Sequence, residues 1–401
     1  MMARLFWLCV SAIVYTYAGY PLLLALLARR HPRPVPNSGH TPPVTVLIAA
    51  YNEEEVLANK LENTLALDYP PDRLQVLVAA DGSQDRTAAI VGEFAARGVE
   101  LSYRPQREGK MAAINRAMDC VRGEVVVFSD ANNLYAPETL QALVAPFSDP
   151  QVGAVSGAKS ILAGDGVLGE SEGLYWKYES FIKKQETRLG SCTGVAGEIL
   201  AVRKDLFQPA PQAVINDDFY LAMQVIRQGY RVVYTDRART YERVSLSAED
   251  EIARRTRINA GRYQAMLLAP HILPLRQPLV VWQVVSHKFL RPLVPLAMIG
   301  AWLANLAAVL RRPRRPSRPA SLLRLDTPWN YVFLGLQGVF YGLACLGRRR
   351  PAAARPGRLE KILYLPAFLF DSNLAALAGL YRYLTGRQTV LWQRVRRRAT
   401  Q

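Results

Sequence analysis

Short β-branched runs alternate with longer stretches of helical periodicity between residues 43 and 270. The runs predict strands at 44–49, 76–80 and 125–129, with a weaker strand at 100–103. Helical periodicity lies between them, at 53–67, 87–97 and 111–121. Because this alternation is typical of βαβ units, the pattern predicts an α/β domain with a mostly parallel sheet over residues 43–270.

An apolar segment of membrane-spanning length precedes this domain. Residues 5–28 contain no charge and are long enough to cross a hydrocarbon core of roughly 30 Å. A cleavable signal peptide is the alternative, but the segment is longer than a typical signal-peptide core and lacks a clear cleavage site before Arg29. We therefore expect a retained transmembrane anchor at 1–30, followed by a proline-rich linker at 31–42.

Further apolar helices are predicted in the C-terminal region, residues 271–401. They cover about 289–310, 329–346 and 362–384. The last of them contains Asp371, and an aspartate at the bilayer centre costs on the order of 3 kcal/mol. This helix is therefore expected either to pack its polar face inward or to lie in the membrane interface.

The net charge of +17 is concentrated at the C-terminal end. Residues 311–401 hold 18 of the 50 basic residues and three of the 33 acidic ones, so +15 lies there and +2 lies in the first 310 residues. Basic runs beside apolar segments are typical of loops that bind anionic lipid headgroups, and solvated loops are the alternative. No nucleic-acid partner is expected, because the globular part has no basic patch with interleaved aromatic residues.

Basic residues also indicate which side of the membrane the domain occupies. Arg29, Arg30 and Arg33 follow the first apolar segment, whereas Arg4 alone precedes it. By the positive-inside rule, the domain at 43–270 is predicted to be cytoplasmic. The Ala-, Arg- and Pro-rich composition is typical of a high-GC bacterium, so we expect an integral protein of the bacterial inner membrane.

Three acidic clusters follow one another along the nearly neutral domain. Asp81 and Asp130 each end a predicted strand, and Asp217 and Asp218 come later. The carboxyl ends of parallel strands form the edge at which open α/β sheets bind ligands. Carboxylates that hold a hard cation, and another that accepts a proton, would suit a nucleotide-activated substrate. Asp81, which precedes Gly82, can also accept a hydrogen bond from the imide N–H of a pyrimidine.

Local structural roles are the alternatives for several of these side chains. Asp85 is expected to cap the helix that follows it. Asp130 and Asn132 would, in the alternative interpretation, form an Asx turn at the end of a strand. In the third cluster, Asp217 would cap the next helix while Asp218 performs the chemistry.

Six motifs follow one another along the chain: AAYNEE at 49–54, DGSQDRT at 81–87, GKMAAIN at 109–115, SDAN at 129–132, NDDFYL at 216–221 and GYRVVY at 229–234. In this order they resemble the signature of the family 2 glycosyltransferases, the inverting, membrane-attached group that includes cellulose, hyaluronan and poly-N-acetylglucosamine synthases. The resemblance implies a GT-A fold and a nucleotide-sugar donor, most often a UDP-sugar, bound with Mg²⁺ or Mn²⁺.

The resemblance assigns donor-binding roles to residues at the strand ends. Asp81 would bind the uracil, Lys110 would approach the phosphates, and Asn115 would support that loop. Asp130 would hold the metal together with Asn132, which occupies the second position of the family's Asp-x-Asp motif. An Asn at that position brings no charge, so the metal is expected to depend more on the diphosphate.

The resemblance also assigns the catalytic base. Asp218 matches the family's catalytic aspartate, and Asp217 stands where Glu is usual; the adjacent charges are expected to raise one pKa. Arg257 matches an arginine that would clamp the diphosphate, and Arg254 stands where Gln is usual. Ile258 replaces a tryptophan that stacks on the acceptor sugar in processive synthases, which favours the addition of one or few sugars.

Gly197 and Glu198 match the acceptor side of the family's site. Glu198 is expected either to bond acceptor hydroxyls or to pair with Arg203. The sequence thus predicts a membrane-bound inverting glycosyltransferase that acts on a lipid or glycan acceptor at the cytoplasmic face of the lipid bilayer. The alternatives are a processive exopolysaccharide synthase and a non-catalytic nucleotide-sugar-binding scaffold. A Rossmann oxidoreductase is disfavoured, because no G-x-G-x-x-G motif follows the first strand.

Overall fold

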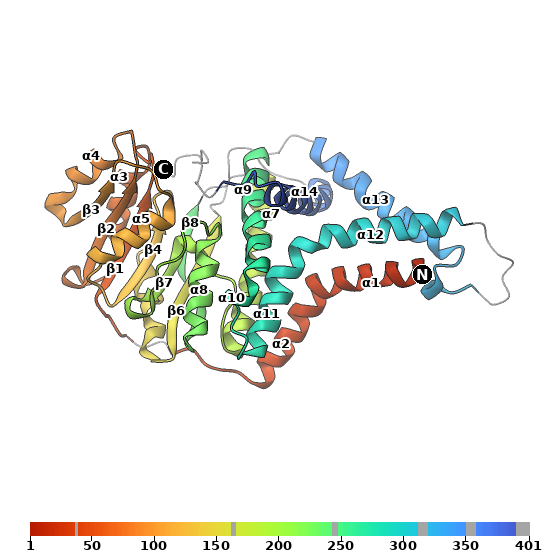
Figure 1. Ribbon diagram of the computed structural model, residues 1–401, viewed down its shortest axis with the longest axis horizontal. Helices are drawn as coiled ribbons and strands as arrows, with labels where there is room; N and C mark the ends of the chain where they lie inside the picture. Colours follow the sequence, from red (N-terminus) through yellow and green to blue (C-terminus); the bar gives the residue numbers. More distant parts are fainter. Residues whose placement is uncertain (37–38, 162–165, 243–247, 312–319, 350–357, 390–401) are drawn as a thin grey trace.

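The computed structural model describes residues 1–401 except 37–38, 162–165, 243–247, 312–319, 350–357 and 390–401. A sheet covered by helices forms one end of the molecule, and long helices extend from the other end (Figure 1). The C-terminal basic runs lie partly or wholly outside the described residues.

Eight strands in the described residues form one sheet. Their order across the sheet is β3-β2-β1-β4-β7-β6-β8-β5. The strands are β1 (Val44–Ala50), β2 (Leu74–Asp81), β3 (Val99–Arg104), β4 (Val125–Asp130), β5 (Leu134–Tyr135), β6 (Val152–Ile161), β7 (Leu200–Arg203) and β8 (Arg231–Glu242). Four of the seven pairings are parallel, and β7 runs antiparallel to both β4 and β6. The predicted α/β class is confirmed, with a mixed sheet.

Helices cover both faces of the sheet, which explains why every residue of β1 is buried. Val46 and Ile48 pack toward one set of helices, and Leu47 packs toward the other. The first set is α3 (Leu57–Leu65), α4 (Thr87–Glu93) and α6 (Thr139–Val144). The second set is α5 (Lys110–Ala117), α8 (Asp217–Arg227), α10 (Ala269–Ile272) and α11 (Pro278–Val284).

The order of the strands reverses beside β1, which has β2 on one side and β4 on the other. Ala50 is in register with Ala80 of β2, and Ala49 is in register with Asp130 of β4. The carboxyl ends of these strands, and with them Asp81 and Asp130, therefore lie along one edge. A reversal of this kind is where open α/β sheets bind ligands.

Helix α3 begins at Leu57, later than its hydrophobic pattern predicted. The backbone before it is held by the next loop, because Glu54 N–H donates to Asp85 Oδ2 at 3.1 Å. Asp85 also accepts a hydrogen bond from Thr87 N–H at the start of α4, at 2.9 Å, which is the capping role predicted for it.

Among the described residues, three helical segments are long and apolar enough to cross a membrane: Met2–Arg30, Pro278–Leu310 and Trp329–Arg349. The first joins α1 (Met2–Val14) to α2 (Tyr20–Arg30), the second joins α11 to α12 (Leu290–Leu310), and the third is α13. A π-helical turn interrupts each of the first two, and the turns contact each other through Tyr15 Oη and Ser286 Oγ, 2.8 Å apart. Both segments bend at this level (Figure 1).

The remaining long helices are α7 (Gly166–Leu189), α9 (Ala248–Leu267) and α14 (Arg358–Leu384). Helix α14 is seen nearly end-on in Figure 1, crosswise to α1 and α12. It crosses α9 closely at Gly379, where an added Cβ would lie 2.8 Å from Thr256 O. These helices connect the sheet to the membrane-length segments.

Candidate active site

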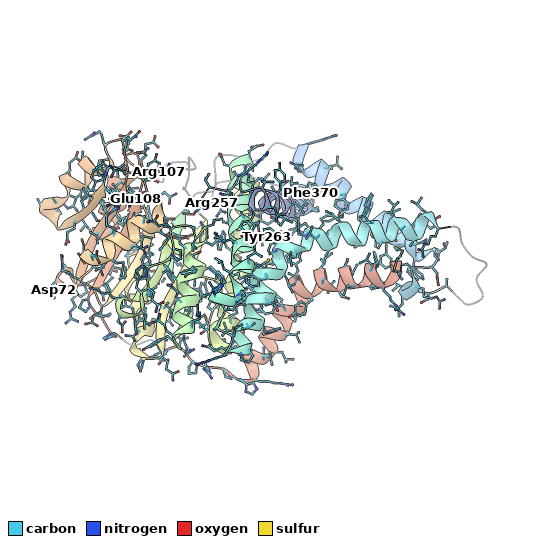
Figure 2. All side chains as sticks on the ribbon, viewed as in Figure 1. Asp72, Arg107, Glu108, Arg257, Tyr263 and Phe370 are labelled. Carbon is cyan, nitrogen blue, oxygen red and sulfur yellow. The ribbon has the colours of Figure 1, made fainter. Side chains whose placement is uncertain are left out.

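Asp81 lies at the base of a small pocket at the end of β2. The carboxylate is 4% exposed and accepts hydrogen bonds from Gly109 N–H at 2.7 Å and Glu108 N–H at 3.1 Å. The loop before α5 can approach this closely because Gly82 has a φ of +66° and no Cβ; an added Cβ would lie 2.7 Å from Arg107. The loop thus lies over the end of β2, where Arg107 and Glu108 are labelled in Figure 2.

Two further residues line this pocket that sequence reasoning did not select. The guanidinium of Arg107 lies 3.7 Å from the centre of the Tyr51 ring. Tyr51 follows β1 directly within the AAYNEE motif, and Arg107 precedes the GKMAAIN motif, so proximity to those motifs was the available signal. An aromatic ring and a cation beside a buried carboxylate can bind a flat, polar base.

Lys110 connects two of the acidic clusters. Its ammonium lies 2.8 Å from Asp130 Oδ1 and 3.5 Å from Asp217 Oδ2. Burial alone would lower the pKa of Lys110, but the two carboxylates outweigh burial and raise this pKa above its usual value. The structure therefore brings Lys110, Asp130 and Asp217 together at the sheet edge.

Asn132 has an unsatisfied oxygen beside this cluster. Within the part of the chain that the structure describes, Asn132 Oδ1 is buried and has no hydrogen-bond partner. An Asx turn would use this oxygen as an acceptor, so its lack of a donor disfavours that alternative for Asn132. An amide oxygen next to a carboxylate fits a hard cation.

The described residues contain no group of three or more His, Cys, Asp or Glu side chains that could hold a metal ion. Asp130 and Asn132 would provide at most two protein ligands, so a bound cation would need further oxygens from a substrate or water. Mg²⁺ commonly binds in this way, with one or two carboxylates and substrate phosphates. The residues present fit such a cation.

Asp218 lies in the first turn of α8. Burial raises its pKa, and the neighbouring Asp217 adds to the effect, so that the pKa of Asp218 is about 6. A carboxylate with this pKa can accept a proton near neutral pH. Gly197 packs directly against it, since a Cβ at position 197 would lie 3.1 Å from Asp218 Cβ.

Helix α9 fixes the segment before Asp218. Asn216 Nδ2 donates to Ile258 O at 3.0 Å, and Gly261 leaves the space for the Asn216 side chain, because an added Cβ would lie 2.5 Å from it. Gln264 Oε1 accepts a hydrogen bond from Ile215 N–H at 2.9 Å. Hydrogen bonds to two residues of α9 therefore orient the turn that contains Asp217 and Asp218.

The two candidate arginines of α9 differ in position. Arg257 lies where the sheet meets the long helices (Figure 2), and its Nη2 is 3.4 Å from Ile215 O. Its Nε is buried and has no hydrogen-bond partner in the described residues. Arg254 pairs with Glu251, with N–O distances of 2.7 and 3.0 Å, and lines a large cavity beside the membrane-length helices.

Glu198 forms an ion pair with Lys159, whose Nζ lies 3.1 Å from Glu198 Oε1 and which also pairs with Glu242. The alternative partner, Arg203, is wrong. Arg203 donates to the backbone carbonyls of Val152 at 2.8 Å and Phe147 at 2.7 Å, because the end of β7 directs it to the neighbouring loop.

Asn115 lies apart from the acidic clusters, on α5. Its Nδ2 donates to Ala210 O at 3.0 Å, which connects α5 to the segment that precedes the Asp217–Asp218 turn. This contact is to a different segment from the loop that Asn115 was predicted to support, so that role stays a prediction.

The large cavity has a volume of about 910 Å³ and meets the site at Asp218. Glu198, Lys159 and Asn216 line it beside Asp218, and apolar residues of α1, α12, α13 and α14 line the rest. Asp218 therefore lies at a junction, with the sheet edge on one side and this cavity on the other.

Residues 45–209 match the family model described as Glycosyl transferase family 2. The chain is 26% identical over 200 residues to the poly-beta-1,6-N-acetyl-D-glucosamine synthase of Staphylococcus aureus (strain COL), covering 48% of this chain and 47% of the relative. It is 27% identical over 218 residues to the beta-monoglucosyldiacylglycerol synthase of Trichormus variabilis, covering 52% and 47%. The chain thus spans about half the length of these curated relatives.

A solved structure supports the fold. The mannosyltransferase PcManGT from Pyrobaculum calidifontis, in complex with GDP-Man and Mn²⁺, superimposes with a TM-score of 0.70 at 24% identity. The match covers 96% of this chain and 100% of that one. Residues 45–209 therefore match glycosyltransferase family 2, and the chain has the GT-A fold, as its motifs predicted.

Proposed function

We propose that the protein is a membrane-bound inverting glycosyltransferase that moves a sugar from a nucleotide-sugar, in the first instance a UDP-sugar, to a lipid or glycan hydroxyl. The observation that carries the proposal is the position of Asp218. This carboxylate lies between the strand-end site and the large cavity, and its raised pKa suits proton abstraction.

The donor would lie along the ends of β1, β2 and β4. The base would lie against Tyr51 and Asp81, with the diphosphate near Lys110. Asp130 and Asn132 would hold Mg²⁺ or Mn²⁺, which when bound offsets the charge that develops on the leaving diphosphate. The unsatisfied Asn132 Oδ1 supports this assignment.

The transfer needs a base on the acceptor side. The acceptor hydroxyl attacks the anomeric carbon from the face opposite the diphosphate, so the configuration is inverted. Asp218 takes the hydroxyl proton, and Arg257 stabilises the departing diphosphate through charge-assisted hydrogen bonds. The unpartnered Nε of Arg257 supports that role.

The membrane-length segments support an integral membrane location. Arginines at the end of α2 favour a cytoplasmic sheet domain, as in a bacterial inner-membrane enzyme. The crosswise direction of α14 favours an interfacial helix over a further span (Figure 1).

A panel of nucleotide sugars, incubated with the purified full-length protein, tests the proposal through UDP or GDP release. Asp218→Asn is expected to lower turnover by roughly 10²- to 10⁴-fold, because general-base catalysis is lost, while UDP still binds. Asp72→Asn is the control, since Asp72 is exposed and lies far from the site (Figure 2). Unchanged turnover in Asp218→Asn would remove the assigned base.

A further inference from the structure

The large cavity beside Asp218 is amphipathic. At its apolar end it is lined by side chains of four helices, among them Val10 of α1, Met298 of α12, Phe340 of α13 and Phe368 of α14. At its polar end lie Asp218, Glu198 and several basic residues. An occupant that matches both ends has an apolar tail and a polar head.

Most basic residues of the polar end already have carboxylate partners. Lys159 pairs with Glu198, and both Arg254 and Arg255 pair with Glu251. Arg291 pairs with Glu179 in a buried network. Each of these four cations therefore has a carboxylate partner, whereas Arg262 of the same wall bonds the amide oxygen of Asn259 at 3.3 Å.

In the same buried network, the carboxylates of Glu179 and Glu186 already have several partners. His287 Nδ1 lies 2.8 Å from Glu186 Oε1, and its Nε2 lies 3.1 Å from Glu179 Oε2. Tyr20 Oη donates to Glu186 Oε1 at 2.6 Å. The two glutamates are therefore shared among residues of α2, α7 and the Pro278–Leu310 segment.

Two lysines of the cavity wall differ from these four cations. Among the described residues, Lys183 and Lys288 form neither an ion pair nor a hydrogen bond. Lys183 is 3% exposed and contacts the rings of Trp176 and Tyr234, with its Nζ 5.7 and 5.4 Å from their centres. A buried cation without a direct ion pair is costly, so this wall favours an anionic ligand.

The two lysines converge on Gly194. A Cβ at this position would lie 2.9 Å from Lys288 Nζ and 3.4 Å from Lys183 Cε. Because like charges repel, an anion bound between the two ammonium groups would stabilise both. Because residue 194 has no Cβ, the Lys288 ammonium can lie this close to the backbone.

The same loop connects this cationic pair to the base. Gly194 precedes Gly197 by three residues, which span at most about 10 Å, and Gly197 packs against Asp218. A phosphate at the lysines would therefore lie within about one headgroup or one sugar of the carboxylate that receives the proton.

We propose that the acceptor is a lipid in which a phosphate ester joins the apolar tail to the hydroxyl that receives the sugar. This inference rests on the proposed function. The phosphate binds Lys183 and Lys288, the tail lies among α1, α12, α13 and α14, and the hydroxyl lies at Asp218. A C–O bond forms between that hydroxyl and the anomeric carbon, the bond to the diphosphate breaks with its electron pair on the diphosphate, and Asp218 takes the proton.

Such a phosphate can come from a phospholipid headgroup or from an isoprenoid lipid phosphate that already bears a sugar. The test presents full-length enzyme in mixed micelles with three acceptors: phosphatidylglycerol, an isoprenoid diphosphate carrying one sugar, and neutral diacylglycerol. Labelled donor is supplied, and label in the extracted lipid is measured. We expect kcat/KM for one of the phosphate lipids to exceed that for diacylglycerol at least about tenfold, and the preferred one identifies the source.

The lysines are tested by Lys183→Gln and Lys288→Gln, with Lys183→Arg retaining the charge. Each Gln variant is expected to raise the acceptor KM about tenfold with a much smaller change in donor KM, and the Arg variant to keep most of the affinity. Lys184→Gln is the matched control, because Lys184 is the next residue, is 45% exposed and pairs with Asp236. Thermal unfolding identifies any variant that fails to fold. If one Gln variant fails to fold, the acceptor KM of the other Gln variant is the test.

Equal or better use of diacylglycerol would overturn the phosphate assignment, and so would acceptor KM values for both Gln variants that match Lys184→Gln. Either result would leave sugar transfer itself intact. If the wild-type enzyme neither transfers sugar to any acceptor nor hydrolyses any donor, the proposed function fails, and this inference fails with it.

Discussion

The two sides of Asp218 have opposite charge imbalances. At the sheet edge, one lysine, Lys110, is shared between the carboxylates Asp130 and Asp217. On the cavity wall, Lys183 and Lys288 meet at Gly194 with no carboxylate partner among the described residues. The excess of acid favours a cation and its diphosphate, and the excess of base favours an anion. The comparison suggests that charge separates the two substrates before the reaction begins.

Removing the acid on the donor side should have the largest effect. Asp130→Ala is expected to lower activity by at least about 100-fold, because the cation loses its charged protein ligand and the leaving group its stabilisation. UDP release measured against Mg²⁺ and Mn²⁺ concentration checks this, with Asp72→Asn as control. Full activity after exhaustive treatment with EDTA would contradict a metal on this side.

A substitution that distorts the cavity wall without changing its charge should raise the acceptor KM and leave the donor KM unchanged. In Gly379→Leu the side chain would collide with the backbone of α9, which costs about 1–3 kcal/mol and separates α14 from that helix. We expect a lower unfolding temperature and a raised acceptor KM. Gly342→Leu is the control, since nothing lies within 4 Å of a Cβ there. Equal effects of the two variants would show that the α9–α14 contact does not shape the cavity.

The pKa of the proposed base, Asp218, should set the pH dependence of kcat. Because Asp218 must be deprotonated to accept a proton and its pKa is about 6, kcat should rise as the pH rises through 6 and level off above 7. Below pH 6 activity should fall about tenfold per pH unit. Asp217→Asn removes the neighbouring charge and should move the profile to lower pH. A profile that Asp217→Asn leaves in place would indicate another titrating group.

The smallest expected effect is an increase in metal affinity at the proposed donor site. Asn132→Asp adds a second charged ligand beside Asp130, so the metal concentration for half-maximal activity should fall. Metal titrations of UDP release measure this. Asn63→Asp is a matched amide-to-acid control, because Asn63 bonds the backbone of Tyr135 instead. No difference from wild type in Asn132→Asp would place the metal elsewhere.

The position of the proposed donor side at the strand ends could be predicted from sequence because it depends on local patterns. Asp81 and Asp130 follow apolar runs that become β2 and β4, and the ends of neighbouring parallel strands meet at one edge. The same reasoning did not extend to β7, a four-residue strand inserted antiparallel between β4 and β6. The chain passes through the long helix α7 between β6 and β7. No short-range sequence pattern indicates that β7 then returns to pair between β4 and β6.

The proposed acceptor side could not be predicted because its residues meet through tertiary packing alone. Lys183 and Lys184 are adjacent in sequence and chemically identical, yet Lys183 is buried in the cavity wall and Lys184 is exposed. Lys288 comes from another helix more than 100 residues away. The pairing of Glu198 with Lys159, where Arg203 was one alternative, has the same origin.

The most direct test compares two lysines on opposite sides of Asp218, in full-length enzyme with labelled donor and a phosphate lipid. Steady-state KM values are measured for both substrates in Lys110→Gln and Lys183→Gln. We expect Lys110→Gln chiefly to raise the donor KM and Lys183→Gln chiefly to raise the acceptor KM. A rise of the same KM in both variants would contradict two substrate sites of opposite charge that meet at Asp218.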